Sequence, residues 1–167
     1  KKLMTWDELF MRHVYLISQK SKDPKTKIGA VLVKDGESDP TSSGFNGFPR
    51  GISDKEELYL NRETKYSLVC HAEFNSVINA ARKGISTIGS ILYTQAPVCN
   101  ECAKAVIQAG IIKVIYHKQF PRLSHLTKWV ESCNLGEAML QEVGIQIVEF
   151  DMILGLKTLL DGELIEV

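Results

Sequence analysis

The order of apolar and polar positions in the first part of the chain predicts a helix followed by two strands. Apolar residues recur at helical spacing over residues 6–17, behind Thr5 and Glu8, whose separation is that of a capping box. We therefore expect a first helix that ends near residue 19. The continuous apolar run 28–33 is typical of a buried strand, and Asp35-Gly36 beyond it predicts a hairpin turn into an antiparallel second strand.

The rest of the chain alternates between helical and strand patterns, with glycines at several boundaries. We expect strands over residues 88–94, 112–116 and 145–150, and helices over residues 58–66, 71–83, 99–109, 123–133, 137–143 and 152–160. Strands and helices in this order favour right-handed crossovers and a sheet with helices on both faces. The pattern thus predicts an α/β protein with a central mixed sheet of about five strands.

Composition narrows the class of protein without changing this fold. The chain has 167 residues, 44% hydrophobic and 24% charged, so residues 1–167 fit a single soluble domain with a sizeable core. Its 20 basic and 20 acidic residues give a net charge of zero, so we expect no nucleic-acid polymer as partner. No apolar run is long enough for a membrane span or a signal peptide, so no membrane partner is expected. The chain begins with Lys1-Lys2, which leaves Met4 as a candidate native start.

The candidate chemistry lies in two short segments, Cys70-His71-Ala72-Glu73 and Pro97-Val98-Cys99-Asn100-Glu101-Cys102. One imidazole and two thiolates are zinc ligands, and three protein ligands leave the fourth tetrahedral position open, as in catalytic zinc sites. A separation of three residues places both thiolates on one side of the first turn of a helix, where the helix dipole favours them. The alternative interpretation is a structural zinc site or two buried thiols, which a C-x-x-C pair without the upstream segment would favour.

Glu73 makes the catalytic interpretation the stronger one. It lies two residues from His71, close enough to move protons to and from a zinc-activated water without being a ligand. The pattern H-x-E followed by P-C-x-x-C is the signature of zinc-dependent nucleobase deaminases. Three of the four cysteines lie in or beside this motif, which favours a reducing compartment and a cytoplasmic location, in the host cytoplasm if the protein is viral. We expect the fourth, Cys133, to be a core thiol on a helix.

Together with other segments, this motif resembles the deoxycytidylate (dCMP) deaminases of the cytidine deaminase-like superfamily. The segments that carry the resemblance extend over most of the chain and are Met4–Phe10, Ser21–Pro24, Ile28–Ala30, Gly44–Gly51, Cys70–Glu73 and Cys99–Lys104. The stretch G-F-N-G-F-P-R-G at 44–51 separates dCMP deaminases from deaminases of free nucleosides, tRNA or polynucleotides. The resemblance implies a three-layer α-β-α sandwich and hydrolysis of dCMP to dUMP and ammonia, which supplies dUMP for thymidylate synthesis.

The resemblance also assigns roles within the site. It implies that one Zn²⁺ is held by His71, Cys99 and Cys102, and that Glu73 is the catalytic proton carrier. The backbone of Ala72 and of the Ala96-Pro97 segment would hold the edge of the pyrimidine, and Asn46 would bind the sugar.

The 5′-phosphate of the nucleotide needs cations, and two sources are open. One is the group Lys22, Lys25 and Lys27, in the loop between the first helix and the first strand. The other is Arg122, which follows the strand expected to end at residue 116. Each of these residues could instead be a solvated surface charge.

In allosteric members of this family, the loop that corresponds to 44–51 helps to bind a nucleoside triphosphate, with dCTP activating and dTTP inhibiting. The resemblance therefore makes Gly44, Asn46, Gly47, Phe48 and Arg50 candidate effector contacts. Arg50 suits phosphate oxygens because its guanidinium presents a planar fork of donors. A Mg²⁺ ion would accompany bound dCTP. Such enzymes are usually hexamers, so a homohexamer is expected.

The sequence departs from the family pattern at three places. Val98 stands between Pro97 and the first cysteine of C-x-x-C, where the family commonly has proline directly before that cysteine. Ile52 replaces a cysteine that is common in the family and cannot ligate metal, so we expect no second zinc at that loop. The region 122–134 is longer than usual, and it is expected either at a subunit contact or over the active site.

Other functions stay open at this point. A close rival also accepts dCTP or lacks nucleotide regulation. Deamination of a free nucleoside or of a tRNA base is disfavoured by the neutral charge and by the 44–51 stretch. A catalytically silent, zinc-stabilised partner subunit is disfavoured by Glu73, because structural zinc does not need that carboxylate.

Overall fold

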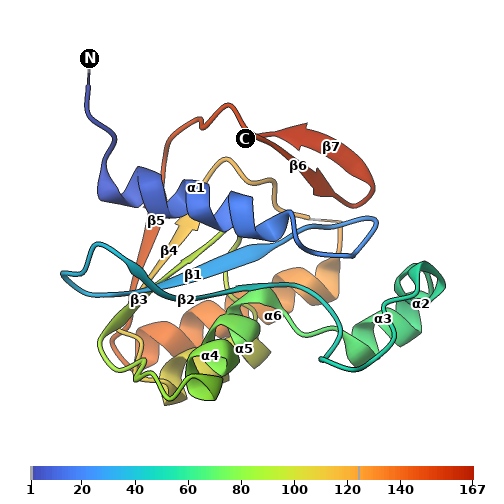
Figure 1. The fold of residues 1–167 in the computed structure, drawn as a ribbon, viewed down its shortest axis with the longest axis horizontal. Coiled ribbons are helices and arrows are strands. Elements are labelled where there is room, and N and C mark those ends of the chain that lie inside the picture. The colour runs from blue at the N-terminus through green and yellow to red at the C-terminus, as the bar shows by residue number, and fades with distance from the viewer. Residues whose placement is uncertain (1, 124) are drawn as a thin grey trace.

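Helices and strands alternate along the chain, and Figure 1 shows them in the computed structural model, which describes residues 2–123 and 125–167. The helices are α1 (Trp6–Ser18), α2 (Glu56–Leu60), α3 (Arg62–Leu68), α4 (Ala72–Arg82), α5 (Asn100–Gln108) and α6 (Thr127–Glu142). The strands are β1 (Gly29–Lys34), β2 (Pro40–Phe45), β3 (Ser90–Thr94), β4 (Lys113–His117), β5 (Gln146–Phe150), β6 (Lys157–Leu160) and β7 (Glu163–Glu166). Most expected elements are therefore present close to their predicted bounds.

The central sheet has five strands in the order β2-β1-β3-β4-β5. β1 is antiparallel to both of its neighbours, whereas β3, β4 and β5 are parallel, so the sheet is mixed, as predicted. In Figure 1, α1 covers one face and α4, α5 and α6 cover the other. The predicted three-layer α-β-α arrangement is confirmed. Among the described residues, no helix has both the length and the apolar character needed to cross a membrane.

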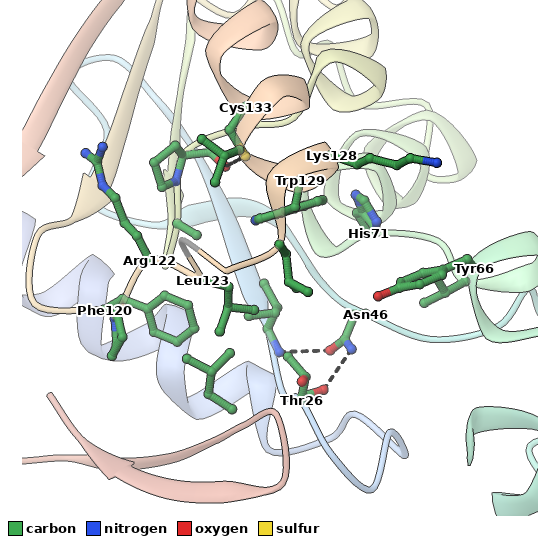
Figure 2. Close-up of a pocket in the computed structure, with 18 of the residues that line it drawn as sticks. Thr26, Asn46, Tyr66, His71, Phe120, Arg122, Leu123, Lys128, Trp129 and Cys133 are labelled. Carbon is green, nitrogen blue, oxygen red and sulfur yellow. Dashed lines mark hydrogen bonds between the residues drawn. The ribbon is translucent and has the colours of Figure 1, made fainter. Parts of the chain in front are cut away.

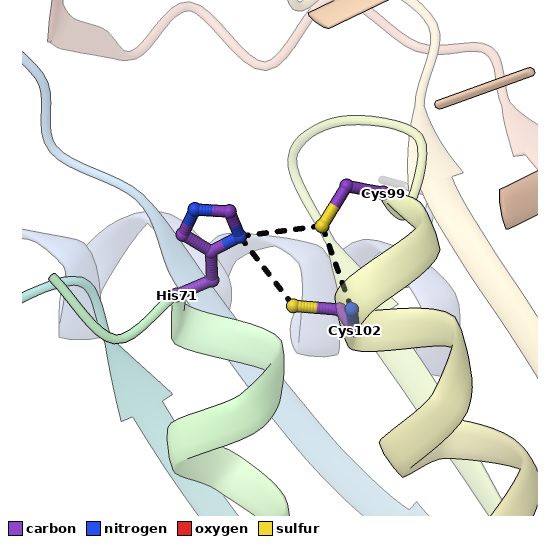
Figure 3. A group of neighbouring side chains, drawn as sticks. All are labelled: His71, Cys99 and Cys102. Carbon is purple, nitrogen blue, oxygen red and sulfur yellow. Dashed lines mark hydrogen bonds between the residues drawn. The ribbon is translucent and has the colours of Figure 1, made fainter. Parts of the chain in front are cut away.

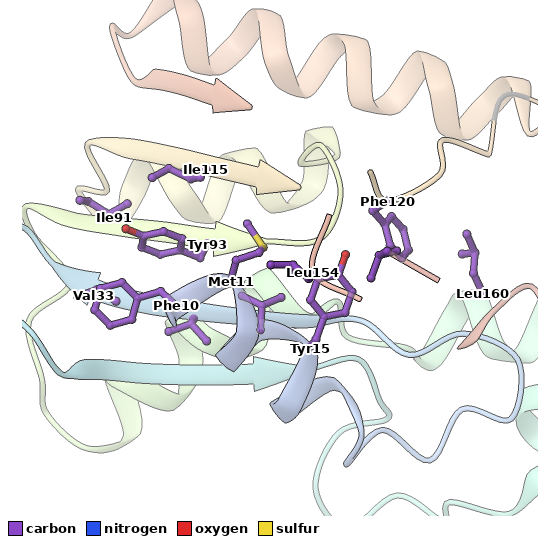
Figure 4. Close-up of a cluster of buried hydrophobic side chains, with 13 residues drawn as sticks. Phe10, Met11, Tyr15, Val33, Ile91, Tyr93, Ile115, Phe120, Leu154 and Leu160 are labelled. Atoms are coloured by element: carbon purple, nitrogen blue, oxygen red, sulfur yellow. The ribbon is translucent and has the colours of Figure 1, made fainter. Parts of the chain in front are cut away.

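The two faces of the sheet have separate cores because successive side chains of a strand point to opposite sides. Val31 and Val33 of β1 belong to the core under α1, which is shown in Figure 4. Ala30 and Leu32 of the same strand belong to the second core, under α4, α5 and α6. Both cysteines of the C-x-x-C motif are members of that second core, so the candidate site is built into the packed interior.

α4 lies unusually close to the edge strand β2. A Cβ atom added at Gly44 would be 2.4 Å from the carbonyl oxygen of Ala72, so only glycine permits this approach. Two side-chain amides of α4 donate to carbonyl oxygens of β2, Asn75 to Phe45 and Asn79 to Ser43, each at 2.8 Å. These contacts fix the helix that begins with the candidate catalytic segment.

The terminal helix predicted over residues 152–160 is wrong. Residues 151–156 form no helix or strand, and β6 and β7 then form an antiparallel hairpin. Asp161 and Gly162 connect the two strands with positive φ angles of 50° and 84°, which is the geometry of a type I′ turn. The apolar run before the turn therefore belongs to a strand, and its Leu160 is buried in the core under α1.

The predicted break between helices at Gly136 is also wrong, because α6 continues through this residue. Gly136 is buried, and a Cβ atom there would be 2.3 Å from the carbonyl oxygen of Val98. The glycine allows close packing against the segment that leads into α5, rather than ending a helix. The glycine at position 136 is therefore explained by a tertiary contact and not by the end of a helix.

Candidate metal centre and active site

The two motif segments meet at the N-termini of neighbouring helices. His71 is the N-cap residue of α4 and Cys99 is that of α5. Figure 3 shows His71, Cys99 and Cys102 with their side chains turned toward one another. The Nδ1 atom of His71 lies 3.4 Å from Sγ of Cys99 and 3.5 Å from Sγ of Cys102. We call these three residues the metal triad.

The spacing of the metal triad fits a zinc ion. Zinc bonds of about 2.0 Å to nitrogen and about 2.3 Å to sulfur, at a tetrahedral angle, put these atoms about 3.5 Å apart. Both observed nitrogen–sulfur distances agree with that separation, and all ligand atoms lie within 4.8 Å of one another. All four cysteines of the chain are free thiols, so none of the ligands is lost to a disulfide.

The electrostatics of the triad favour a single thiolate, on Cys99. Burial opposes a charge on His71, but the hydrogen bond with Cys99 and the nearby Glu73 carboxylate together raise its pKa. The hydrogen bond from Cys102 lowers the pKa of Cys99 well below its ordinary value, and the same bond raises the pKa of Cys102. The pair therefore holds one thiolate readily, and a cation between the sulfurs would stabilise a second one.

Glu73 is buried beside the metal triad without belonging to it. Its Oε1 accepts a hydrogen bond of 3.0 Å from Thr94 at the end of β3, and its Oε2 lies 3.9 Å from Sγ of Cys102. Burial raises the pKa of the Glu73 carboxyl above its ordinary value, against the lowering effect of His71. A carboxyl group with this environment is suited to accept and donate a proton near neutral pH.

A cavity of about 670 Å³ opens beside this group and is shown in Figure 2. The expected substrate contacts Asn46, Ala72, Ala96 and Pro97 all line it, together with His71 and Glu73. The structure thus brings together the residues that the resemblance assigned to the pyrimidine and the sugar. Its volume lies in the range of small-molecule sites.

Asn46 is buried, and its side-chain amide is engaged with the loop before β1. Its Oδ1 accepts from the backbone N–H of Ile28 at 2.8 Å, and its Nδ2 donates to the carbonyl oxygen of Thr26 at 2.9 Å. The carboxylate of Asp23 lies 3.5 Å from the same nitrogen and forms an ion pair with Lys65 of α3 at 2.6 Å. Asn46 therefore fixes one wall of the cavity.

The three lysines proposed for the phosphate are not among the residues that line the cavity. Lys22 pairs with Asp54 at 2.7 Å, Lys25 is exposed, and the Nζ of Lys27 donates to the carbonyl oxygen of Ser21. Arg122 does line the cavity, where its guanidinium contacts Tyr116 at 3.0 Å and Glu149 at 3.4 Å. The other basic residues of the lining are Arg62, Lys65, His125 and Lys128.

The 44–51 loop is hydrogen-bonded to the segment that leads into His71. Gly47 and Cys70 exchange two backbone hydrogen bonds, of 3.1 and 2.8 Å, directly before His71. Phe48 stacks on Tyr59 with ring centroids 3.9 Å apart. Ile52 is partly exposed on this loop.

Arg50 lies at a second, smaller hollow of about 400 Å³ and contacts Oδ1 of Asn79 at 2.5 Å. Arg82 and Lys83, at the end of α4, line the same hollow. We call it the basic hollow. Three cationic side chains around one depression form a surface suited to phosphate groups.

Sequence reasoning missed several residues of the site. Thr94 orients Glu73, but in the sequence it is only a polar residue at the end of a predicted buried strand. Trp129 of α6 contacts the ring of His71 edge-on, with centroids 5.6 Å apart at 76°. The described residues of the long region 122–134 therefore lie over the candidate site, which is one of the two positions expected from its length.

A three-layer α/β fold that carries a His-Cys-Cys triad beside a buried glutamate defines the class of zinc-dependent nucleobase deaminases. Comparison with protein families agrees with this class. Residues 4–118 match the family described as the cytidine and deoxycytidylate deaminase zinc-binding region, and the chain belongs to this family.

Individual relatives narrow the comparison. The chain is 39% identical to the deoxycytidylate deaminase of Homo sapiens over 118 residues, which cover 68% of this chain and 65% of the human protein. It is 33% identical to an uncharacterized deaminase in the luxG 3′ region of Aliivibrio fischeri, over 85% of this chain and 91% of that protein. Among solved structures, dCMP deaminase from the cyanophage S-TIM5, in complex with dCMP and dUMP, aligns with a TM-score of 0.65 and 28% identity. That alignment covers 89% of this chain and 100% of the cyanophage chain.

Proposed function

We propose that this protein hydrolyses dCMP to dUMP and ammonia and thereby supplies dUMP for thymidylate synthesis. The observation that carries the proposal is the buried Glu73 carboxyl, 3.9 Å from a thiol of the metal triad and at the wall of a cavity large enough for a nucleotide. The names of the human and cyanophage relatives support dCMP as the substrate. We further propose that residues 1–167 act as one domain. We also propose a cytoplasmic location, because the ligand cysteines must stay reduced and the cytoplasm keeps thiols reduced.

In this proposal His71, Cys99 and Cys102 hold the zinc ion. When bound, zinc supplies the Lewis acidity that makes water nucleophilic near neutral pH. Glu73 accepts one proton of the attacking water and gives it to the ring nitrogen. It then accepts the second proton from the oxygen that has bonded to the ring carbon and delivers it to the departing amine. Thr94 holds the carboxylate in position for these transfers through its 3.0 Å hydrogen bond.

The remaining contacts bind the nucleotide. The backbone of Ala72 and of Ala96-Pro97 holds the edge of the base, and Asn46, whose amide is held by the loop before β1, contacts the sugar from the cavity wall. The water oxygen first bonds to the ring carbon that carries the amine. The bond from that carbon to the protonated amine then breaks, and ammonia leaves. Apolar side chains of the cavity wall, among them Ile28, Leu123 and Trp129, offer contact surface to the base.

For the 5′-phosphate, Arg122 has the advantage over the lysine group because it lines the cavity. Replacing Arg122 with alanine should raise the Michaelis constant for dCMP much more than that for deoxycytidine. Lys25→Ala, in the lysine group, and Lys128→Ala, in the cavity lining, test the other candidate cations by the same comparison of Michaelis constants. Equal effects of a variant on both substrates would reject a phosphate role for that residue.

We also propose that a nucleoside triphosphate regulates the enzyme, with dCTP activating, dTTP inhibiting and Mg²⁺ accompanying dCTP. Gly44, Asn46, Gly47, Phe48 and Arg50 remain the proposed contacts, and the three cations of the basic hollow support an anionic effector there. A hexameric assembly belongs to this part of the proposal.

The test compares deamination of dCMP, deoxycytidine and dCTP, each with and without dCTP or dTTP as effector. We expect strong preference for dCMP, with rates moved by both triphosphates, and a hexamer in sedimentation. If dCMP is deaminated at a rate that neither triphosphate changes, the proposed reaction stands and the proposed regulation is rejected. Zinc-loaded protein that turns over none of these substrates would favour the silent, zinc-stabilised subunit.

A further inference from the structure

α6 contacts both segments that carry the metal triad. It begins at Thr127, beyond residue 118 where the family match ends, so the match itself assigns it no role. Figure 2 shows Trp129 and Cys133 on the side of α6 that faces the cavity, with His71 nearby. Three independent contacts connect this side to the metal triad.

The first contact is the close approach at Gly136. A Cβ atom there would be 2.3 Å from the oxygen of Val98, 2.8 Å from the carbonyl carbon of Cys99 and 3.0 Å from the nitrogen of Asn100. All three are backbone atoms of the turn that presents Cys99 as the N-cap of α5. Backbone cannot rotate out of the way as a side chain can, so any larger residue would have to move this turn or the helix.

The second contact is a pair of hydrogen bonds to the same turn. Ser132 Oγ donates to Oδ1 of Asn100 at 2.6 Å and accepts from the backbone N–H of Asn100 at 3.4 Å. The thiol of Cys133 lies 3.7 Å from the carbonyl oxygen of Pro97. Residues on both sides of Cys99 are thus attached to successive positions of α6.

The third contact reaches the other half of the triad. The indole of Trp129 meets the His71 ring edge-on at 5.6 Å, which is a favourable geometry for two aromatic rings. His71 contacts both sulfurs of the triad through Nδ1, and the aromatic contact restrains the orientation of the ring about that nitrogen.

We propose that α6 positions the metal ligands, with Gly136 and Ser132 fixing the turn at Cys99 and Trp129 fixing the ring of His71. This inference rests on the proposed zinc site, but it does not depend on which substrate is deaminated. Contacts that orient metal ligands from outside typically change metal affinity about 10- to 100-fold when they are removed.

The experiment measures zinc affinity by competition with a chromogenic chelator, together with the absorption spectrum of the cobalt(II)-loaded protein. We expect Gly136→Ala to bind zinc at least tenfold more weakly and to alter the thiolate-to-cobalt bands. Alanine favours helix more than glycine does, so a loss of helix propensity could not explain this result. The matched control is Leu135→Ala, at the adjacent and exposed position of α6, which should leave both readouts unchanged.

Trp129 supplies a second, independent series. Trp129→Leu should weaken zinc binding, and Trp129→Phe should restore much of the loss because it keeps an aromatic ring against His71. If circular dichroism shows that Gly136→Ala does not fold, this series and Ser132→Ala decide the question. Wild-type affinity and spectra in the Gly136→Ala and Trp129→Leu proteins would overturn the inference.

Failure of the proposed function has a different signature. Wild-type protein that binds zinc tightly but deaminates no nucleotide would overturn the proposed reaction, while the variant affinities would still test the role of α6. Wild-type protein that binds no zinc would overturn both.

Discussion

Glu73 is a carboxyl group in a place where a charge is costly. It is 7% exposed, and burial raises its pKa even though its carboxylate accepts a hydrogen bond from Thr94. The sequence predicted Glu73 and the metal triad correctly as neighbours, because H-x-E followed by C-x-x-C is one combined motif whose two halves are expected to meet at a single zinc site. It did not predict Thr94, because the partner of a buried carboxylate depends on how the sheet packs against α4.

At this scale, Glu73→Ala should keep zinc and lose nearly all turnover, about 10²- to 10⁴-fold or more, because it removes the carboxyl that lies beside the metal triad. Zinc content by elemental analysis and dCMP turnover are measured on the same sample. His71→Ala is the control, and it should lose metal as well as activity. Retained turnover in Glu73→Ala would reject the proposed proton carrier.

A second residue-scale prediction concerns His117, which is buried outside the candidate site. Its Nδ1 accepts from the hydroxyl of Tyr15 at 2.6 Å and its Nε2 donates to the carbonyl oxygen of Met152 at 2.7 Å, so the neutral ring satisfies both. Burial lowers the pKa of His117 below 6.5, against the raising effects of Met152 and Asp151.

A lowered pKa in the folded state means that the unfolded chain binds more protons below pH 6.5. The free energy of unfolding should therefore fall as the pH drops below about 6.5, by at most about 1.4 kcal/mol per pH unit from this group. Urea unfolding between pH 5 and 7.5 measures it, with His117→Gln as the comparison. Parallel pH curves for the two proteins would contradict this assignment.

At the scale of elements, the helices and strands with regular periodicity were predictable, whereas the C-terminal hairpin was not. Residues 152–160 are apolar enough to resemble a helix, and the Asp161-Gly162 turn signal lies just beyond them. Only the packing of Leu160 against the core under α1 decides between the two. Likewise, the sequence predicts a helix boundary at Gly136, and only the packing of α6 against the turn before α5 explains the glycine.

Close packing of α4 on β2 gives the prediction at this scale. Gly44→Ala should destabilise the protein by about 1–3 kcal/mol, because its Cβ atom would lie 2.4 Å from the backbone oxygen of Ala72. Gly47→Ala in the same loop is the matched control, since its Cβ atom would meet only the Tyr59 hydroxyl at 3.7 Å. It should change stability by less than about 0.5 kcal/mol. Equal stability of the two variants would show that α4 can move away from β2 at little cost.

For the whole molecule, the metal triad joins two helices that the chain separates by a strand. Because the folded protein binds zinc through preformed ligands, metal should stabilise the fold by about 4 kcal/mol at a free concentration 1,000 times the dissociation constant. For a chain of this size, that corresponds to a Tm higher by about 8–16 °C.

Scanning calorimetry with buffered zinc, and then with excess chelator, measures this shift. His71→Ala is the control, and zinc should not raise its Tm. A wild-type Tm that is independent of zinc would contradict a metal site formed by the folded protein.

α4 begins at the metal triad and ends at the basic hollow, and a helix of 11 residues is about 16 Å long. Asn75 and Asn79, one helical turn apart, attach it to β2. Under the proposed regulation, an anion that draws Arg50 away from Asn79 would release the side chain that also binds Ser43 of β2, and α4 would carry the change to Glu73. Thermodynamic reciprocity then requires that a nucleotide bound beside Glu73 changes the affinity of the basic hollow by the same factor.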